Sequence, residues 1–554
     1  MTSQAFSGAV YRIPYDGSAQ ALPSRESVGS KAHNLMRMAR IGLPVPAGFV
    51  LGTELCRAYL AHGPAALEGL DRILERELAA LGTVTGTMFG DPRRPLLVSV
   101  RSGAAISMPG MMETVLDIGL NARTLAGLVR MTGNPRLARD CYRRLIEQFG
   151  EVVHAIAPAV FEARCRTTLA EHGWTTLEDI DTAGLHEVVQ AQLDQFQIET
   201  GTPFPEEQLV QLRQAVLAVL RSWTSERATN YRRLNAIPDD IGTAVTVQAM
   251  VFGNAGPRSG SGVGFTRSPA DGDNRMYVDY VPNAQGEDVV SGRRTALGAD
   301  ELERRAPDAY HALVAARSAL EHEFGDMQDF EFTVEQGRLL MLQTRAGKRT
   351  PLAALRIACD LVAEHRITPE VAAERLRGID IEAIETVSLR TTPGERPITV
   401  GTPAGPGVAI GVVVFSADRM ALVAGRGGGT ILVRPSADTN DVAALVDAEA
   451  LVTVEGARTS HAAVVARQLG KVCVVACRDL RIDPSLRFAM AGDVRLEEGA
   501  VVAVDGQTGR VFQGPHEVDR ARPEAMIAAA RAWLAPANRA GRSRKPTGRG
   551  RASA

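Results

Sequence analysis

Residues 455–467 have the sequence EGARTSHAAVVAR, in which one histidine stands directly before an alanine-rich segment. Alanine, arginine, glutamine and leucine favour helix, so residues 462–469 predict a short helix that Thr459 or Ser460 can cap. His461 then lies in the first turn, where free N–H groups and the helix dipole stabilise an anion such as phosphate. Because an imidazole is nucleophilic near neutral pH, His461 is a candidate phosphoryl carrier. The local pattern leaves open a capped core helix whose histidine only forms hydrogen bonds.

The composition limits the classes of protein that the sequence can encode. A chain of 554 residues predicts about three or four domains. A net charge of -2, with 23% charged residues, argues against nucleic acid or a membrane as the main partner. No stretch approaches the ~20 uninterrupted apolar residues of a membrane span, so we expect a cytoplasmic protein. Of six cysteines only Cys473 and Cys477 are close together, in an apolar run that favours free buried thiols over zinc ligands.

Two N-terminal segments have residues suited to phosphate. Lys31 follows a Gly-Ser pair at a predicted helix start, where a lysine can reach a polyphosphate, although most lysines are simply solvated. The apolar residues 96–100 predict a strand that leads into Arg101 and the loop SMPGMM at residues 107–112. Such a strand end can present a cation and backbone N–H groups to phosphate, and an ordinary Gly-Pro turn is the alternative.

The middle of the chain changes from helical to strand periodicity. Residues from about 120 to 230 have apolar residues at helical spacing, which predicts a helical insertion of mainly architectural role. Residues 243–252 alternate like a strand, and a glycine-rich segment, residues 253–267, follows. A loop from Gly253 to Gly262 between two strands would let the backbone close over phosphates, but flexible hairpins have the same composition.

A hairpin with one polar face is predicted next. Residues 329–334 and 339–345 alternate as strands, joined by a turn at residues 335–338. If the register aligns them, one face holds two carboxylates, an amide and a guanidinium, namely Asp329, Glu331, Gln343 and Arg345. The carboxylates could hold Mg²⁺ and the arginine a polyphosphate, as phosphoryl transfer requires. A solvent-exposed, salt-bridged hairpin is the alternative.

A linker and a second α/β region complete the chain. Helical patterns continue to about residue 383, and the polar, Pro/Gly-punctuated residues 388–397 predict an interdomain linker. At ~3.3 Å per residue such a linker could span roughly 30 Å. Alternating strand and helix patterns from residue 401 to residue 515 predict a compact α/β domain around His461.

Taken together and in this order, the motifs resemble the pyruvate phosphate dikinase family from about residue 25 to residue 515. Related phosphoenolpyruvate synthases share the architecture, but the run NAQGED at residues 283–288 and the helical insertion are more similar to the dikinases. The segments that carry the resemblance are LVSVRSG (97–103) with SMPGMM (107–112), VQAMVFGN (247–254), NAQGEDVV (283–290), MLQTR (341–345) with GKRT (347–350), and TSHAAVVAR (459–467).

The resemblance implies a mixed α/β (α+β) fold, with an ATP-grasp-like nucleotide-binding domain and a small swivelling phosphohistidine domain. The implied divisions are 1–112 and 241–350 for the two parts of the nucleotide-binding domain, 113–240 for the helical insertion, 351–400 for helices and linker, 401–515 for the phosphohistidine domain, and 516–554 for a helix and a basic, disordered tail.

The resemblance also implies a reaction and a set of residues. ATP would phosphorylate His461, and inorganic phosphate would accept the remaining phosphoryl group, giving AMP and pyrophosphate with Mg²⁺ as cofactor. Catalytic roles are implied for Arg101, Arg345, Thr459 and His461, with Arg458 nearby. Nucleotide binding is implied for Lys31, Ser107, Gly110, Gly253, Gly260, Gly262, Glu287 and Gln343. Metal binding is implied for Asp329 and Glu331.

The chain departs from the family pattern in two places. Only about 40 residues follow Gly514, whereas the pyruvate- and phosphoenolpyruvate-binding barrel of the family needs ~250. The sequence therefore leads us to expect a separate barrel protein as partner, or another acceptor. The second departure precedes the histidine, where Glu455, Ala457 and Arg458 replace a basic residue, a glycine and an apolar residue of the family.

Three functions follow from the sequence. The first is an ATP- and phosphate-dependent phosphotransferase that passes its phosphoryl group to pyruvate through a partner barrel, or to another acceptor. The second is a catalytically inactive, nucleotide-binding regulatory or scaffold remnant. The third is a nucleic-acid or acidic-partner contact made by the basic residues 539–551, for which a solvated tail is the favoured account. The sequence leaves open the final acceptor and whether the chain forms a homodimer.

Overall fold

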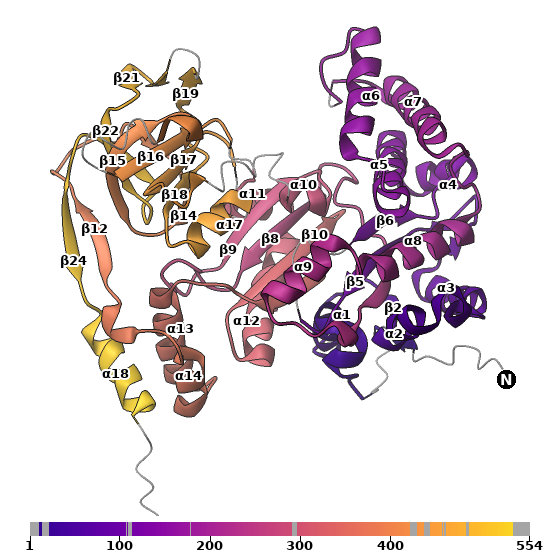
Figure 1. The fold of residues 1–554 in the computed structure, drawn as a ribbon, viewed down its shortest axis with the longest axis horizontal. Helices are drawn as coiled ribbons and strands as arrows, with labels where there is room; N and C mark the ends of the chain where they lie inside the picture. Colours follow the sequence, from indigo (N-terminus) through magenta and orange to yellow (C-terminus); the bar gives the residue numbers. More distant parts are fainter. Residues whose placement is uncertain are drawn as a thin grey trace, which may run out of the picture.

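The computed structural model places most of the chain in three larger sheets, of five, four and eight strands, with their helices and three smaller sheets (Figure 1). It describes residues 10–13, 21–106, 108, 113–177, 179–290, 296–420, 429–436, 444–456, 458, 461–483 and 487–535. Helices and strands alternate throughout, which confirms the predicted mixed α/β class. In these residues no helix combines the length and the apolar character needed to cross a bilayer.

The N-terminal sheet has five strands in the order β1-β2-β7-β5-β6, and every pair is antiparallel. The strands are β1 (Val10–Arg12), β2 (Gly48–Leu51), β5 (Val98–Gly103), β6 (Thr114–Ile118) and β7 (Ala244–Ala249). Also in this part of the chain are the helices α1 (Arg25–Arg40), α2 (Thr53–His62) and α3 (Leu70–Thr85) and the short parallel pair β3 (Met88–Phe89) and β4 (Pro95–Leu96). The predicted strand at residues 96–100 is thus divided between β4 and β5, and Arg101 lies within β5.

The predicted helical insertion is confirmed between β6 and β7. Its helices are α4 (Ala122–Thr132), α5 (Pro135–His154), α6 (Pro158–Glu171), α7 (Thr182–Thr200), α8 (Gln208–Ser222) and α9 (Glu226–Leu234). Asn121 and Asn134 cap α4 and α5, because their side-chain oxygens accept backbone N–H groups of the first turn. Apolar residues of α4, α5, α7 and α8 form one core with the N-terminal sheet.

The central sheet has the antiparallel order β11-β10-β8-β9. Its strands are β8 (Gly260–Phe265), β9 (Tyr277–Pro282), β10 (Gln328–Glu335) and β11 (Arg338–Ala346), with helices α10 (Gly286–Val290), α11 (Ala299–Arg305) and α12 (Pro307–Phe324) nearby. The predicted hairpin is confirmed, and Asp329 pairs with Arg345 and Glu331 with Gln343. The four polar side chains therefore do share one face, as the alternation predicted.

The linker prediction needs correction, because part of it is a paired strand. Strand β12 (Thr386–Arg390) pairs antiparallel with β24 (Glu517–Ala521), so the chain enters and leaves the last domain along one two-stranded ribbon. Backbone hydrogen bonds make this ribbon stiffer than a single extended chain. At the end of the ribbon away from the last domain, three helices share an apolar core: α13 (Pro351–Ala363), α14 (Pro369–Leu376) and α18 (Glu524–Leu534). Residues 536–554, with the basic tail, lie outside the described residues.

The histidine domain, from β13 to β23, has an eight-stranded sheet of order β13-β23-β22-β15-β16-β17-β18-β14 and a three-stranded sheet of order β19-β20-β21. The strands are β13 (Thr399–Val400), β14 (Thr402–Gly405), β15 (Val408–Val414), β16 (Gly429–Arg434), β17 (Ala450–Thr453), β18 (Val472–Val475), β19 (Leu480–Asp483), β20 (Phe488–Ala491), β21 (Val494–Glu497), β22 (Val501–Asp505) and β23 (Arg510–Gln513). Cys473 and Cys477 are free and buried, as predicted.

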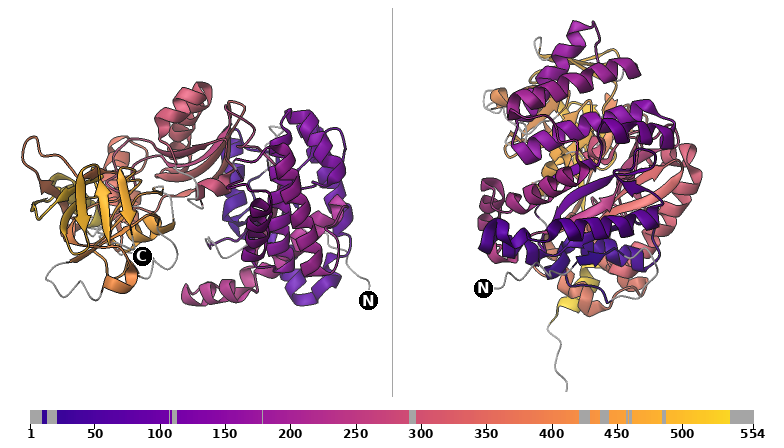
Figure 2. Two further views of the ribbon diagram at one scale, coloured as in Figure 1. Left: turned by 90° about the horizontal axis from the view of Figure 1, so that it is seen from above. Right: turned by 90° about the vertical axis from the view of Figure 1, so that its right-hand side faces the viewer.

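The predicted helix at the histidine is α17 (His461–Gln468). Its alanines pack in an apolar cluster with Leu432 and Leu451 of the sheet, which explains the alanine-rich sequence. Figure 1 shows α17 at the side of the histidine domain that faces β9. In the left-hand view of Figure 2 the histidine domain (orange and yellow) and the helical insertion (purple) lie at opposite ends of the molecule.

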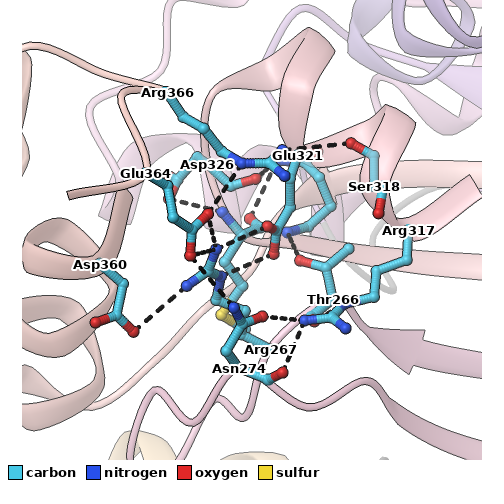
Figure 3. Close-up of polar contacts among 12 residues, drawn as sticks. Thr266, Arg267, Asn274, Arg317, Ser318, Glu321, Asp326, Asp360, Glu364 and Arg366 are labelled. Carbon is cyan, nitrogen blue, oxygen red and sulfur yellow. Dashed lines mark hydrogen bonds and ion pairs between the residues drawn. The ribbon is translucent and has the colours of Figure 1, made fainter. Parts of the chain in front are cut away.

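An ion-pair cluster around Arg267 ties the central sheet to the helices that follow it (Figure 3). The Arg267 guanidinium is 1% exposed and donates to both carboxylate oxygens of Glu321 on α12, at 2.9 and 3.0 Å. It also donates to Glu364, at 2.8 and 2.9 Å, and to Asp360 of α13, at 3.4 Å. One buried arginine therefore joins the end of β8 to α12 and α13.

Candidate active site

One face of the central sheet carries two rows of side chains in direct register. Residues directly opposite each other on neighbouring strands point to the same face, so the pairing defines each row. The first row, from β11 to β9, is Arg345, Asp329, Phe265 and Tyr277. The second row is Gln343, Glu331, Val263 and Asp279. The polar residues that the sequence predicted on the hairpin thus continue into an aromatic pair at the other edge.

The carboxylates of the two rows are held by their neighbours on β11. Arg345 Nε donates to Asp329 Oδ2 at 2.7 Å, and Gln343 Nε2 donates to Glu331 Oε1 at 3.1 Å. Burial raises the pKa of Asp329, and the adjacent Arg345 opposes that shift. These bonds leave one oxygen of each carboxylate for a further ligand.

Two cations approach the same face from the N-terminal part of the chain. Lys31 of α1 and Arg101 of β5 both interact electrostatically with Glu331. Burial lowers the pKa of both groups, and Arg101 and Arg345 lower that of Lys31 further. Within the described part of the chain no carboxylate forms an ion pair with Lys31 or Arg101. Partly desolvated cations that lack a paired carboxylate are suited to binding a polyanion.

A glycine brings Lys31 to this position. Gly29 has φ +77°, and a Cβ there would lie only 2.2 Å from the carbonyl oxygen of Gly103. Only glycine fits this close contact, which presses the start of α1 against the end of β5. Ser30 completes it by donating its hydroxyl to the carbonyl oxygen of Ala105. The Gly-Ser pair of the sequence is therefore a structural requirement for placing Lys31 beside Arg101.

Glu287 completes the charged cluster from α10. It interacts electrostatically with Arg101, and burial raises its pKa, an effect that Arg144 opposes. Gln148 of α5 donates to both Glu287 oxygens at 2.6 Å, and Arg144 contacts the Asp288 carboxylate at 3.0 and 3.1 Å. Arg144 and Gln148 were not predicted as site residues, because polar residues on an amphipathic helix look like part of an exposed face. They show that the helical insertion supports the site as well as the core.

The glycine-rich segment differs from its predicted form. Gly260 and Gly262 lie inside β8, so the prediction of a loop is wrong for these two residues. A Cβ would lie 2.3 Å from the Tyr280 hydroxyl oxygen at Gly260, and 2.4 Å from the Phe332 ring at Gly262. Both glycines are therefore needed for aromatic packing on this strand. Gly253 does lie in the preceding loop, where a Cβ would meet Ser261 Oγ and the carbonyl oxygen of Ala284.

The last turn of α17 lies near the aromatic end of the first row, because Arg467 belongs to that turn. The Arg467 guanidinium is 5.9 Å from the centre of the Phe265 ring and interacts electrostatically with Asp279 and Asp329. An α-helix rises 1.5 Å per residue, so the backbone of His461 lies about 9 Å from Arg467 along the helix axis. The His461 side chain and the predicted site residues Ser107, Gly110 and Thr459 lie outside the described residues.

Next to the site, Asp117 of β6 is a buried carboxyl that the sequence analysis did not single out. Its side chain is 0% exposed, and burial raises its pKa to about 8, with Glu287 and Asp140 adding to the shift. Between pH 4 and 8 the unfolded chain has released the proton that folded Asp117 retains. Stability should therefore fall as pH rises through this window, by up to about 1.4 kcal/mol per pH unit.

Asp117→Asn should remove this pH dependence, because asparagine has no proton to release and tolerates the positive φ of 58° at this position. Urea midpoints of wild type and variant at pH 5, 6, 7 and 8 would measure it. We expect the variant to gain stability relative to wild type as pH rises. Parallel curves across the four pH values would show that Asp117 ionises normally.

Comparisons with known proteins agree with this arrangement of domains. Residues 66–303 match the family model of the pyruvate phosphate dikinase AMP/ATP-binding domain, and residues 427–509 match that of the PEP-utilising enzyme mobile domain. Pyruvate, phosphate dikinase of Clostridium symbiosum is 41% identical over 90% of this chain and 57% of its own length. The enzyme of Rhizobium meliloti is 40% identical over 92% and 58%, and the chloroplastic enzyme of Zea mays is 40% identical over 92% and 54%, respectively.

The chain thus spans between half and three fifths of the length of these relatives. Two family models and about 40% identity along nine tenths of the chain support the resemblance inferred from the motifs. The chain thus has the AMP/ATP-binding domain of pyruvate phosphate dikinases and the mobile domain of PEP-utilising enzymes, and it is homologous to pyruvate phosphate dikinases over about nine tenths of its length.

Proposed function

We propose that this chain is a phosphotransferase that phosphorylates its own His461 from ATP in the presence of inorganic phosphate. An imidazole nitrogen of His461 attacks the β-phosphorus, the bond to the α-phosphate oxygen breaks, and AMP leaves. An oxygen of inorganic phosphate then attacks the γ-phosphorus to form pyrophosphate, and the bond between the γ-phosphorus and the bridging oxygen breaks, with its electron pair staying on the β-phosphoryl oxygen. The β-phosphoryl group remains on His461 for transfer to an acceptor.

One observation carries the proposal: α17, which begins at His461, lies beside the face of the central sheet that carries Asp329. The charges of Arg467 and Asp329 interact, although the two residues belong to different domains. A phosphoryl carrier must be held close to its donor for transfer to occur in line. The interaction of Arg467 with Asp329 supports the proposal that His461, at the other end of the same helix, can approach the candidate phosphate site.

The proposed roles follow from charge. Lys31, Arg101 and Arg345 would bind the β- and γ-phosphates and stabilise the charge that develops during transfer. Asp329 and Glu331 fit Mg²⁺, since each has a carboxylate oxygen not used by its β11 neighbour. Mg²⁺ is typically held by one or two carboxylates plus substrate phosphates, and bound here it would neutralise phosphate charge. Glu287 and Gln343 would contact the nucleotide or its metal.

The acceptor is proposed from the names of the relatives. They are named pyruvate, phosphate dikinases, and this chain spans only part of their length. We propose pyruvate as the acceptor, bound by a barrel domain on a partner protein or on the same polypeptide, with another small molecule as the alternative acceptor. A carrier domain on a two-stranded ribbon can meet a second site without dissociating, because tethering keeps its effective concentration high.

The test is incubation of the purified chain with Mg²⁺ and ATP labelled at either the β- or the γ-phosphate, with and without inorganic phosphate. We expect β-label to be retained on the protein and γ-label to leave as pyrophosphate when phosphate is present. AMP should form in a one-to-one ratio with labelled protein. Measurable ATP binding without label from either position would refute the proposal in favour of a non-catalytic scaffold.

A further inference from the structure

Tyr277 of β9 makes two contacts with the histidine domain. The Arg458 guanidinium carbon lies 3.6 Å from the centre of the Tyr277 ring, the distance of a cation–π contact. The Tyr277 hydroxyl donates to the carbonyl oxygen of Pro403 in β14, at 2.9 Å. One side chain of the central sheet thus contacts the histidine domain with its ring face and with its hydroxyl.

Tyr277 lies in the same row as candidate site residues, so its contacts with the histidine domain also place that domain relative to the site. Tyr277 ends the row that begins with Arg345 and Asp329, and its neighbour Phe265 faces Arg467 of α17. A domain fixed at Tyr277 therefore holds α17 at the aromatic end of the row, in line with the residues proposed to bind phosphate and metal. The register of the sheet determines where the histidine helix is held.

The environment of Arg458 indicates a contact that can open. Burial and the nearby Arg467 lower the pKa of Arg458 to about 9, and its buried Nε has no hydrogen-bond partner among the described residues. Arg467 donates to the Arg458 carbonyl oxygen at 2.8 Å, which keeps the two arginines close. The aromatic face attracts the cation, but removing a guanidinium from water opposes the contact. A balance between these effects suits a domain that must leave this position to deliver its phosphoryl group.

We propose that Arg458 is a positioning residue that docks the histidine domain on the Phe265–Tyr277 edge of the central sheet. An arginine differs from an apolar residue here because the guanidinium is attracted to one ring face and so orients the domain. The expected effect of docking on His461 labelling rests on the proposed function, whereas the docking contact itself does not.

The test measures docking and phosphorylation separately. Spin labels at the exposed positions Leu234→Cys and Val400→Cys would report the distance between the helical insertion and the histidine domain. The labels would be placed in a Cys359→Ser background, since the other cysteines are buried. The variants are Arg458→Met, Tyr277→Leu, Tyr277→Phe and the double variant of the first two. Arg481→Met, an exposed arginine of the same domain, is the matched control.

We expect Arg458→Met and Tyr277→Leu each to reduce the ratio of docked to undocked molecules about tenfold. Each should slow His461 labelling at saturating ATP by a similar factor, with ATP affinity changed less than twofold. The double variant should be no slower than Tyr277→Leu alone, because the contact between the Arg458 guanidinium and the Tyr277 ring is already lost in that variant. Tyr277→Phe, which keeps the ring, should retain most of the docked molecules.

The proposal would be overturned if the docked fractions of Arg458→Met and Tyr277→Leu were both within twofold of that of the Arg481→Met control. Additive effects in the double variant would also overturn it, since they would mean that the two side chains act independently. Should the wild type fail to label at all, the distance measurement still decides whether Arg458 docks the domain. Failure of the docking proposal is therefore distinguishable from failure of the proposed phosphotransferase.

Discussion

His461→Ala should abolish labelling of the protein by β-labelled ATP, a loss of more than about a thousandfold limited only by detection. The variant has no nitrogen nucleophile at the start of α17, so no covalent intermediate can form. Its ATP affinity should stay within twofold of wild type, because the candidate nucleotide-binding cations Lys31 and Arg101 belong to a different part of the fold. Equilibrium ATP binding and label retained after denaturing gel filtration measure the two properties.

The matched control is His62→Ala, which removes an exposed histidine at the end of α2, away from the central sheet. It should label at the wild-type rate. Label that persists on His461→Ala would mean that another residue accepts the phosphoryl group. Loss of ATP binding in His461→Ala would instead point to a folding defect or to a nucleotide site that includes the histidine.

Arg267→Met should lower the free energy of unfolding by about 3–5 kcal/mol, because it leaves the buried Glu321 carboxylate without its partner. Glu321 is 3% exposed, so water cannot replace the guanidinium. The same change removes the Arg267 contacts of Glu364 and Asp360, which loosens α13 from the central sheet. For a transition of domain size this is a decrease in melting temperature on the order of 10 °C.

Differential scanning calorimetry would test this against Arg275→Met. Arg275 is 87% exposed and pairs with Asp273, and exposed pairs contribute little, so its melting temperature should be almost unchanged. The double variant Arg267→Met/Glu321→Met should recover part of the lost melting temperature, because two apolar side chains replace a buried charge pair. Equal melting temperatures for Arg267→Met and Arg275→Met would show that the cluster is not stabilising.

Local sequence was enough to predict the elements that carry the site. Alternation of polar and apolar residues identified the hairpin and the shared face of Asp329 and Glu331, because side-chain direction in a strand depends only on position. Alanine content and a capping residue identified α17. The same local reasoning placed Gly260 and Gly262 in a loop, because it had no information on the Tyr280 and Phe332 rings that pack against them.

The strand β12 was missed for a related reason. Polar, Pro/Gly-punctuated residues are typical of linkers, and β12 is stabilised by β24, more than a hundred residues away in the sequence. Arg144 and Gln148 were missed because a charged helix face is usually solvated, whereas here it faces α10. In each case the deciding partner comes from a distant segment, which a local pattern does not contain.

The sequence by itself determined the polar face of the hairpin and the histidine at a helix start, because these depend on spacing within one element, and its motifs implied the class of fold through their resemblance to a known family. Only the tertiary structure decided that Lys31, Arg101, Glu287 and Glu331 form one charged cluster, since they come from four different elements. It also decided that α17 lies beside Asp329, with Arg458 on the Tyr277 ring. Electrostatic and cation–π contacts act through space, so residues far apart in the chain form them only once packing has brought their elements together.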